Sequence, residues 1–583
     1  MDLEVDVCMQ VDDDRGHILR VKRAEDMLWY AGAFSTTAGG DDETTVVIRC
    51  VTVALGRDGW SKQPASKGSS FTTIDGTEAF NEAKLKEPPQ AFSKPSLILH
   101  LCCLVGFFCS TVNGYDGSLL NGLLINDAFK TFFHGSEDGL WAGIVTSIYQ
   151  IGSVAALPFV GPAIDKFGRK GGMLIGAAII IVGTIVNATT YWSASIGQFE
   201  AGRFILGFGV SIMQTAGPMY VVETTHPAYR GVVTGLYNTF WYVGSMVAAG
   251  AVRGAISKPG NHWTIPIWLQ MLFSGLVMCF AWFLPESPRW LYANGRTDEC
   301  RRVLTKFHAN GNEDSIWVRL QLREYDEYLR LDGSDKRWWD YRGLFRDRAS
   351  SYRLLCNIIV VVCGQWMGGA VLTYFMSSLL TSAGYKSEMD KANINLAYSC
   401  EQFVIAIIGA LSVDKLGRRA LLLFACIGCS IVWIGLSVAT SQYDLRQDAA
   451  SSKAATAMIF LFGAVFSFGM TPMQVLYPVE VLSFEQRAKG MALSSFAVNA
   501  AALLNQFAWP VALKKIGWRT YIIFVVWDAV QAVVIYFFIP ETKNRTLEEL
   551  DDIFNARSPR KESTRKKTVA LNGEKTVVMG DES

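Results

Sequence analysis

The chain has 583 residues, of which 50% are hydrophobic, 12% aromatic and only 18% charged. Soluble domains carry about 25% charged residues, so this composition is typical of a membrane protein. The formal net charge of +1 excludes a protein that binds nucleic acid through a strongly basic surface. No metal-ligand spacing, nucleophile motif or phosphate-binding glycine loop predicts an enzyme, and we expect no metal and no cofactor.

Residues 1–94 are polar, rich in Gly, Ser, Thr and charged residues, and without sustained periodicity. This composition predicts a mostly disordered cytoplasmic extension. Twelve later stretches approach the length of about 20 residues that a helix needs to cross a bilayer. The predicted spans are residues 97–124, 139–160, 172–191, 198–222, 232–252, 267–284, 354–381, 393–413, 419–439, 457–479, 490–512 and 520–539.

Basic clusters follow every second predicted span up to the tenth. They are "DKFGRK", "HPAYRG", the segment 285–353, "DKLGRR" and "FEQRAKG". Because Lys and Arg favour the cytoplasmic side, we expect these loops and both termini to be cytoplasmic. The loop "LKKIGWR" departs from this pattern.

The long polar segment 285–353 contains two stretches with helical spacing of apolar residues. These are "TDECRRVLTKFH" and "SIWVRLQLREYDEYL". Apolar residues at intervals of three and four predict short amphipathic helices. The segment is therefore expected to form a small cytoplasmic helical layer, and a solvated linker is the alternative.

Three motifs occur twice, once in each half of the chain. "GPAIDKFGRKGGMLIG" (161–176) recurs as "GALSVDKLGRRALLLF" (409–424), "GPMYVVETTHPAYRG" (217–231) as "VLYPVEVLSFEQRAKG" (475–490), and "PESPRW" (285–290) as "PETKNR" (540–545). Such self-similarity indicates an internal repeat. We expect two homologous six-helix halves, residues 95–284 and 354–540, joined by the linker 285–353 and followed by a cytoplasmic tail, 541–583.

The repeated motifs resemble those of the sugar porters of the major facilitator superfamily. Their residues are similar to those of the fungal lactose/hexose permease-like branch of this family. The resemblance covers residues from about 95 to 555. It implies an all-α membrane fold of twelve transmembrane helices in two pseudo-symmetric halves. It also implies a substrate cavity between the halves that opens alternately to each side.

Charged residues of the first two repeats are candidates for a cytoplasmic gate network. They are Asp165, Arg169, Glu223 and Arg230 in the first half, and Asp414, Arg418, Glu480 and Arg487 in the second. Gly168 and Gly417 permit sharp turns, so these side chains can meet at neighbouring helix ends and form a network that breaks between states. Topology signals alone are the alternative, although topology does not require Glu223 or Glu480.

A sugar presents hydroxyl groups that need amide and aromatic partners in a largely preformed cavity. At 1.5 Å per residue, Gln365 lies roughly 16 Å into its predicted span, and Asn499 lies at a similar depth. Asn238 is nearer the cytoplasm, and Tyr374 lies above Gln365. The family pattern is only partly kept, since "GQWMGGA" lacks the asparagine of hexose porters. Glucose recognition is therefore not implied, and interhelical hydrogen bonds are the alternative role.

Asp116 in "STVNGYDGSLLNGLL" and Arg203 in "GRFILGFGV" lie inside predicted spans. An uncompensated charge is costly there, and the two depths match, so we predict a pair. In proton-coupled members of the resembled family, a "GYD" aspartate and an arginine occupy these motif positions, and the acid carries the proton. We expect Asp116 and Arg203 to couple transport to protons. A static pair is the alternative, and Glu401 and Asp528 are rival proton carriers.

The resemblance therefore predicts a monomeric secondary active transporter in the plasma membrane that imports a mono- or disaccharide, such as a hexose or lactose, by proton symport. A facilitative sugar uniporter and a sugar-sensing receptor on the same scaffold stay open. Fungal sensors of this scaffold tend to have long cytoplasmic tails. Only 43 residues follow Pro540 here, which favours transport.

Overall fold

The computed structural model describes residues 86–136, 139–258, 260, 262–332, 342–482, 487–543, 547–564, 568–572 and 575–579. Its regular elements are helices, apart from one antiparallel hairpin between β1 (Thr568–Asn572) and β2 (Lys575–Met579). In this hairpin Thr568 pairs with Met579 and Asn572 with Lys575. Residues 1–85 of the predicted N-terminal extension lie outside the described part of the chain.

The helices fall into four groups along the chain. The N-terminal helices are α2 (Lys94–Ile125), α3 (Asp127–Phe132), α4 (Gly139–Ala188), α5 (Thr190–Ser193), α6 (Ile196–Thr224), α7 (Arg230–Ile256), α8 (Thr264–Leu269) and α9 (Met271–Phe280). The linker helices are α10 (Pro288–Ala293), α11 (Thr297–His308) and α12 (Ile316–Asp332). The C-terminal helices are α13 (Arg348–Trp366), α14 (Gly369–Ser382), α15 (Glu388–Leu416), α16 (Arg418–Arg446), α17 (Ala449–Gly469), α18 (Met473–Val481), α19 (Arg487–Ile516) and α20 (Thr520–Phe538).

The last group is α21 (Leu547–Asn555) and α22 (Pro559–Thr564). Four single turns of 3₁₀ helix connect the others: η1 (Pro227–Tyr229), η2 (Ala281–Phe283), η3 (Arg342–Phe345) and η4 (Gly517–Arg519). Side-chain caps begin several of the long helices. Ser93 Oγ accepts the Ser96 N–H at 3.3 Å, and Ser195 Oγ accepts that of Gln198 at 3.4 Å. Such caps satisfy N–H groups that have no partner within the helix.

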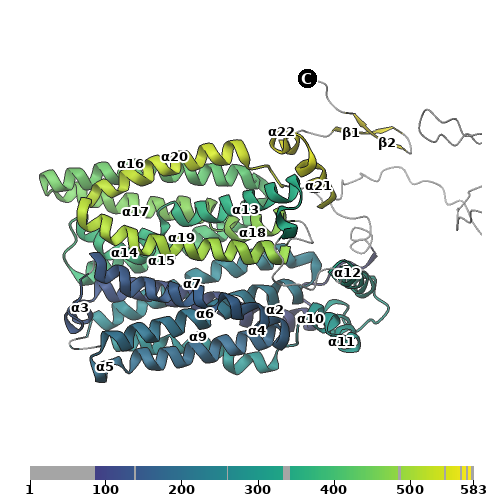
Figure 1. Ribbon diagram of the computed structural model, residues 1–583, viewed down its shortest axis with the longest axis horizontal. Helices are drawn as coiled ribbons and strands as arrows, with labels where there is room; N and C mark the ends of the chain where they lie inside the picture. The colour runs from purple at the N-terminus through teal and green to yellow at the C-terminus, as the bar shows by residue number, and fades with distance from the viewer. Residues whose placement is uncertain are drawn as a thin grey trace, which may run out of the picture. The chain divides into compact units, whose positions relative to one another are not determined.

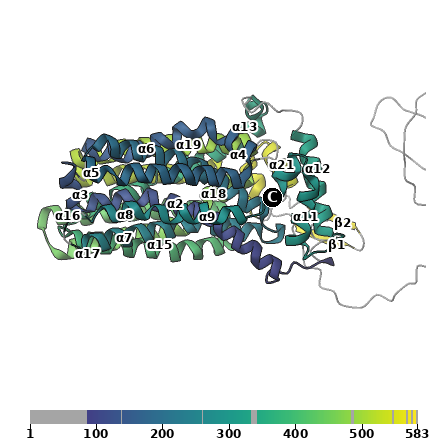
Figure 2. The same cartoon turned by 90° about the horizontal axis from the view of Figure 1, so that it is seen from below.

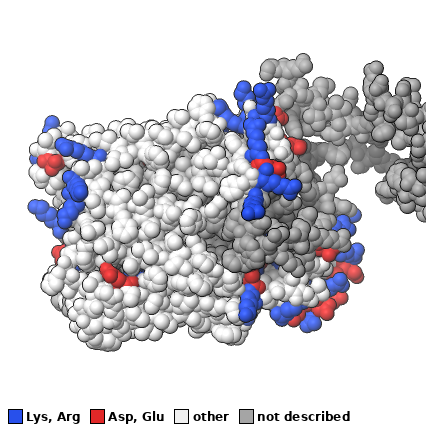
Figure 3. All heavy atoms as spheres, in the orientation of Figure 1, with Lys and Arg blue, Asp and Glu red and all other residues white. Residues whose placement is uncertain are grey.

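Within the described residues, nine helical stretches are long and apolar enough to cross a membrane. Figure 3 shows Lys, Arg, Asp and Glu mainly at two ends of the described surface, with an almost uncharged zone between them. The protein is therefore a multi-pass membrane protein. The stretches Gly139–Ser193 and Leu493–Phe538 each include two of the predicted spans. Helix α7, which carries the polar residues Asn238, Ser245 and Arg253, is not among the nine.

Glycines with positive φ separate helices at two places. The sequence predicts the first break, between the spans 139–160 and 172–191, but not the second. Gly168 interrupts α4 with φ 80° and ψ 173°, so one helix ends and another begins there. Gly368, with φ 96°, separates α13 from α14, whereas the sequence predicts one continuous span over 354–381. Glycine adopts positive φ without the penalty that a Cβ atom brings. Trp433 Nε1 donates to the Met367 carbonyl at 3.0 Å and so satisfies an acceptor freed by the break.

Buried hydrophobic side chains form two large cores. One lies within residues 102–284, and the other lies within residues 356–554 together with Leu124 and Ala142 from the N-terminal helices. Figure 1 shows the two groups of helices side by side, with α7 close to α15 and α2 close to α14 of the C-terminal group. Small residues allow close approach within a group. A Cβ atom on Gly114 of α2 would overlap the Trp241 carbonyl of α7.

Figures 1 and 2 place α11 and α12 at one end of the helix bundle, here named the linker end, with α3 and α5 at the opposite, distal end. Leu291, Cys300, Leu304 and Val318 form a separate small core among the linker helices. Helices thus form at both predicted positions of the segment 285–353.

The described end of the N-terminal extension contacts the linker helices. The Glu87 carboxylate accepts hydrogen bonds from Ser315 Oγ and, at 3.3 Å, from the Ile316 N–H at the start of α12. The Trp317 indole N–H donates to the Glu87 carbonyl at 2.8 Å, and the Tyr229 hydroxyl donates to the Pro89 carbonyl at 2.8 Å. Residues 86–93 therefore hold α12 beside the helix bundle.

His226 is buried where the linker helices meet the N-terminal helices. Its ring packs at 4.7 Å from the Trp317 ring and at 5.2 Å from that of His308. Its Nδ1 accepts the Ala228 N–H at 3.2 Å, which requires the neutral ring. Burial, followed by the electrostatic effects of His308 and Arg230, lowers the pKa of His226 to about 3.

This environment predicts acid sensitivity. The folded state keeps His226 neutral, while the unfolded chain takes up a proton below about pH 6.5. The contribution of His226 is therefore complete above pH 6.5 and is lost as the pH falls toward 3. At pH 5 the loss is about 2 kcal/mol. His226→Asn, which keeps an acceptor for the Ala228 N–H but does not titrate, should reduce the fall in thermal stability between pH 7.5 and 5 in detergent. Identical pH dependence of the parent and variant proteins would contradict the assignment.

Candidate functional site

Asp116 lies in the C-terminal third of α2 and is completely buried. Its Oδ1 atom accepts a hydrogen bond of 2.8 Å from Gln270 Nε2. Gln270 stands at the joint between α8 and α9, where the helix is interrupted. Among the described residues, Asp116 Oδ2 has no hydrogen-bond partner. One oxygen of a buried carboxyl group is thus held by an amide, and the other is left available.

Arg203 of α6 reaches the same place but does not contact the carboxylate. Its NH1 atom donates to the Asp116 backbone carbonyl at 3.3 Å, and its guanidinium lies 4.8 Å from the centre of the Tyr149 ring. Within the described chain the predicted side-chain ion pair is therefore not formed. The physical reason is that Gln270 occupies the carboxylate while the Tyr149 ring attracts the guanidinium by a cation–π interaction.

Tyr374 brings the C-terminal helices to this cluster. A Cβ atom on Gly117, the residue after Asp116, would lie 3.9 Å from the Tyr374 hydroxyl. Tyr374 and Tyr149 both interact electrostatically with Arg203. The structure thus brings together three predicted site residues, Asp116, Arg203 and Tyr374, at the boundary between the two helix groups.

Two predicted amides form hydrogen bonds across that boundary. Asn238 Nδ2 of α7 donates to the Thr471 carbonyl at 2.8 Å. Asn499 Oδ1 of α19 accepts a hydrogen bond from Gln150 Nε2 of α4. Tyr242 also bonds across the boundary, since its hydroxyl lies 2.9 Å from Thr471 Oγ1. These amides are thus partners of the opposite helix group in this state.

Gln365 is placed differently. Its backbone carbonyl accepts the Asn505 amide at 2.7 Å, and the break at Gly368 separates it from Tyr374, so the predicted spacing along one helix does not hold. Beside them, Gln506 of α19 is completely buried, and its side-chain amide lies close to the Tyr374 hydroxyl. Gln150, Gln270 and Gln506 are polar residues that the sequence analysis missed, although each is a buried amide within a predicted span.

A second polar cluster lies at the linker end of the N-terminal helices. Arg169 Nε is 2.8 Å from Glu223 Oε2, and its NH2 donates to Oε1 at 3.0 Å. The Ser287 hydroxyl also donates to Glu223. Asp165 is exposed and lies 3.7 Å from Arg169. The Glu286 carboxylate accepts the Lys170 N–H at 3.3 Å, at the start of the helix that follows Gly168. Burial raises the pKa of Glu286, and backbone N–H groups oppose this rise.

The C-terminal helices repeat this arrangement with equivalent residues. Arg418 NH2 lies 2.7 Å from Glu480 Oε1, and the Thr542 hydroxyl donates to Glu480 Oε2 at 2.7 Å. The Glu541 carboxylate accepts the N–H groups of Arg418 and Arg419 at 2.9 and 3.0 Å. Gly417, with φ 96°, supplies the turn. Glu286 and Glu541 were not predicted as site residues, although the repeated "PES" and "PET" motifs contain them.

The other network candidates are not part of these clusters. Arg230 forms no ion pair among the described residues and instead faces His226 and His308. The side chains of Asp414 and Arg487 lie outside the described part of the structure. Both arginine–glutamate pairs are contained within one helix group, so neither pair crosses between the groups.

These features define a class of protein. A mainly helical membrane protein with buried polar residues between two helix groups, and with matching clusters at one end of each group, has the architecture of a membrane transporter. A family model described as "Sugar (and other) transporter" matches residues 102–554. The chain therefore belongs to this family, the sugar porters of the major facilitator superfamily. Its relatives are transporters and not enzymes.

Two curated relatives and one solved structure illustrate the similarity. The chain is 30% identical over 475 residues to the high-affinity glucose transporter of Kluyveromyces lactis, covering 76% of this chain and 82% of the relative. It is 26% identical over 478 residues to a probable quinate permease of Aspergillus flavus, covering 78% and 88%. The proton:xylose symporter XylE bound to 6-bromo-6-deoxy-D-glucose is 19% identical, with a TM-score of 0.65, over 78% of this chain and 99% of that one. This last likeness shows the fold.

The carboxylates of Glu286 and Glu541 generate a prediction about stability. Glu541→Gln replaces one acceptor oxygen by an NH₂ group that faces backbone N–H donors, which should destabilise the protein by about 1–3 kcal/mol. Glu286→Gln should act in the same direction. The measurement is thermal unfolding of the purified protein in detergent. Glu299→Gln, which removes an exposed ion pair with Arg296, is the matched control and should change little. Equal effects at Glu541 and Glu299 would refute the assignment.

Proposed function

We propose that the chain crosses the membrane twelve times, as two pseudo-symmetric six-helix halves. The support comes from the nine apolar stretches, two of which contain a break that allows two crossings each, together with α7. The break at Gly168 separates the first such pair, and η4 separates the second. The repeated clusters around Arg169 and Arg418 support the internal symmetry.

The linker end is proposed to face the cytoplasm, with both termini on that side and the linker 285–353 as a cytoplasmic helical layer. The support is the concentration of Arg and Lys in the loops at this end, which is the pattern expected of cytoplasmic loops. A plasma-membrane location and function as a monomer follow from the family resemblance.

The proposed activity is import of a mono- or disaccharide by alternating access. The observation that carries it is the set of amide and hydroxyl groups that bond across the boundary between the helix groups. Sugar hydroxyls both donate and accept hydrogen bonds, so a bound sugar can replace the contacts of Asn238 with Thr471 and of Asn499 with Gln150. Gln365, Tyr374 and the buried amide of Gln506 would add further contacts. A ligand that exchanges for contacts between the groups shifts their relative positions.

Proton coupling is proposed to reside in Asp116 and Arg203. A neutral Asp116 exerts no net attraction on Arg203, and the guanidinium stays on the Tyr149 ring as seen here. Once Asp116 loses its proton, its charge attracts Arg203 across the short distance to its side chain, because an unpaired carboxylate is costly in this environment. The arrangement of α2 and α6 therefore depends on the protonation state. A facilitative uniporter, in which Asp116 and Arg203 only hold helices, is the alternative.

The test is transport by purified protein in sealed proteoliposomes. The parent should accumulate labelled sugar when a pH gradient is imposed, with a panel of hexoses, pentoses, lactose and quinate defining the substrate. Asp116→Asn, a near-isosteric neutral change, should abolish this accumulation while sparing sugar counterflow. Asp528→Asn is the matched control and should retain both activities.

The outcomes separate the alternatives. Accumulation that persists in Asp116→Asn at normal incorporation would contradict proton coupling through this residue. Loss of gradient-driven accumulation in Asp528→Asn would instead assign proton coupling to Asp528. Counterflow without gradient-driven accumulation in the parent would identify a uniporter. Binding of sugar without any counterflow would favour a sensing receptor.

The arginine–glutamate clusters are proposed to act as a cytoplasmic gate, by fixing the helix ends of each half in the outward-open state. Arg169→Ala leaves Glu223, which is 7% exposed, without its partner, and the cost of an unpaired buried charge is about 3–5 kcal/mol. The variant should favour inward-open conformers. Labelling of a cysteine introduced at the cytoplasmic side should then become faster than in the parent and in Lys166→Ala, an exposed control. Unchanged labelling would argue against the gate.

A further inference from the structure

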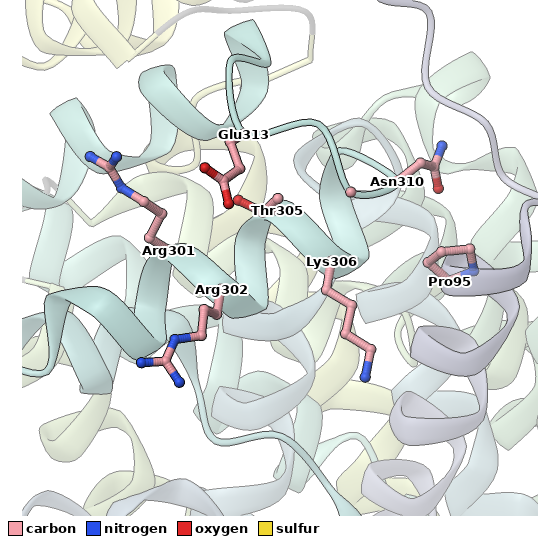
Figure 4. Close-up of a pocket in the computed structure, with 8 residues that line it drawn as sticks. Pro95, Arg301, Arg302, Thr305, Lys306, Asn310 and Glu313 are labelled. Carbon is pink, nitrogen blue, oxygen red and sulfur yellow. The ribbon is translucent and has the colours of Figure 1, made fainter.

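A trough of about 400 Å³ is lined by α11, the loop that follows it and the first turn of α2, at the linker end. Its lining includes Arg301, Arg302, Thr305 and Lys306 of α11, Glu313 of the following loop, and Pro95 at the first turn of α2. Figure 4 shows Arg302 and Lys306 extending to the same side of α11, as residues four apart on a helix do. Three positive side chains and one negative one give the lining an excess of two positive charges.

A buried hydroxyl group stands among these charges. Thr305 is only 8% exposed, and its Oγ1 atom has no hydrogen-bond partner among the described residues. Burying a hydroxyl group without a partner is unfavourable, so an occupant of the trough that offers an acceptor would relieve this cost. Arg301, Arg302 and Lys306 form no ion pair among the described residues. The site therefore offers cationic donors and a hydroxyl to an anion.

The neighbourhood of the trough is apolar and belongs to a membrane-crossing stretch. Helix α11 packs against α2, and the first turns of α2 carry Leu97, Ile98 and Leu101 with exposed fractions of 46, 47 and 63%. Lys306 is close enough to Cys102 of α2 to act on its thiol electrostatically. The cationic trough thus meets the apolar surface of α2 within two turns of that helix.

We propose that this trough binds the headgroup of an anionic phospholipid whose acyl chains lie along the first turns of α2. A free phosphate ion would match the charges but not the exposed apolar strip beside them, whereas a lipid matches both. Basic pockets next to membrane helices on the cytoplasmic side are suited to anionic headgroups, and the proposed orientation places the linker end there. The lipid would fix α11, and with it the linker, against the membrane surface.

The test is lipid titration of the purified full chain in detergent, followed by native mass spectrometry. Phosphatidylserine is the anionic probe and phosphatidylcholine the neutral one. The parent should bind phosphatidylserine more tightly. The double variant Arg302→Gln with Lys306→Gln should lower this affinity by about tenfold or more, because two charge-assisted contacts are lost, and should leave phosphatidylcholine binding unchanged. The matched control is Arg319→Gln with Arg323→Gln, which removes the same charge from the exposed surface of α12.

A second variant distinguishes a specific headgroup site from non-specific electrostatic attraction between the protein and anionic lipids. Thr305→Val removes the hydroxyl group without changing the charge, and it should lower phosphatidylserine affinity severalfold while leaving the lipid-free protein at least as stable in thermal unfolding. Equal loss of affinity in the two double variants, or no preference for phosphatidylserine in the parent, would overturn the proposal. Displacement of phosphatidylserine by millimolar inorganic phosphate would also overturn it and assign the trough to a free anion.

Discussion

Two carboxylates at the linker end hold together the chain segments on which the rest of the architecture depends. A helix begins with N–H groups that have no partner within the helix. Glu286 supplies the acceptor for the helix after Gly168, and Glu541 does the same for α16 after Gly417. Each acid comes from the segment that leaves the last helix of its group. In each group, the segment that follows the last membrane helix is thus joined by hydrogen bonds to the start of another helix.

The same two segments position the arginine–glutamate pairs. Ser287 and Thr542 stand next to the capping acids and donate to Glu223 and Glu480, which in turn bind Arg169 and Arg418. Each helix group therefore contains a cluster of one arginine, two glutamates and one hydroxyl residue with corresponding contacts. Each cluster thus joins helix ends within its own helix group, and neither cluster links the two groups.

Much of the fold could be predicted from local sequence patterns, because the length of an apolar stretch and a repeated motif can both be recognised in consecutive residues. The membrane helices, the helix α11 from Thr297 to His308 and the family resemblance were all accessible in this way. The break at Gly368 could not be predicted in this way, because the residues around a glycine in an apolar stretch do not indicate whether its φ angle is positive. Tertiary contacts decided it, through Trp433. The partner of Asp116 was missed for a related reason: charge complementarity favoured Arg203, whereas Gln270, 154 positions away in the chain, donates to the carboxylate.

The contact between Glu87 and the start of α12 has a consequence for synthesis of the chain. These partners are 229 positions apart, and ribosomes add about 5–20 residues per second. The segment 86–93 therefore leaves the ribosome about 10–45 s before the donor groups of residues 315–317 have been synthesised. The helices from α2 to α11 are synthesised in this interval. The contact can therefore form once α12 has been synthesised, while the helices from α13 to α20 are still to be made.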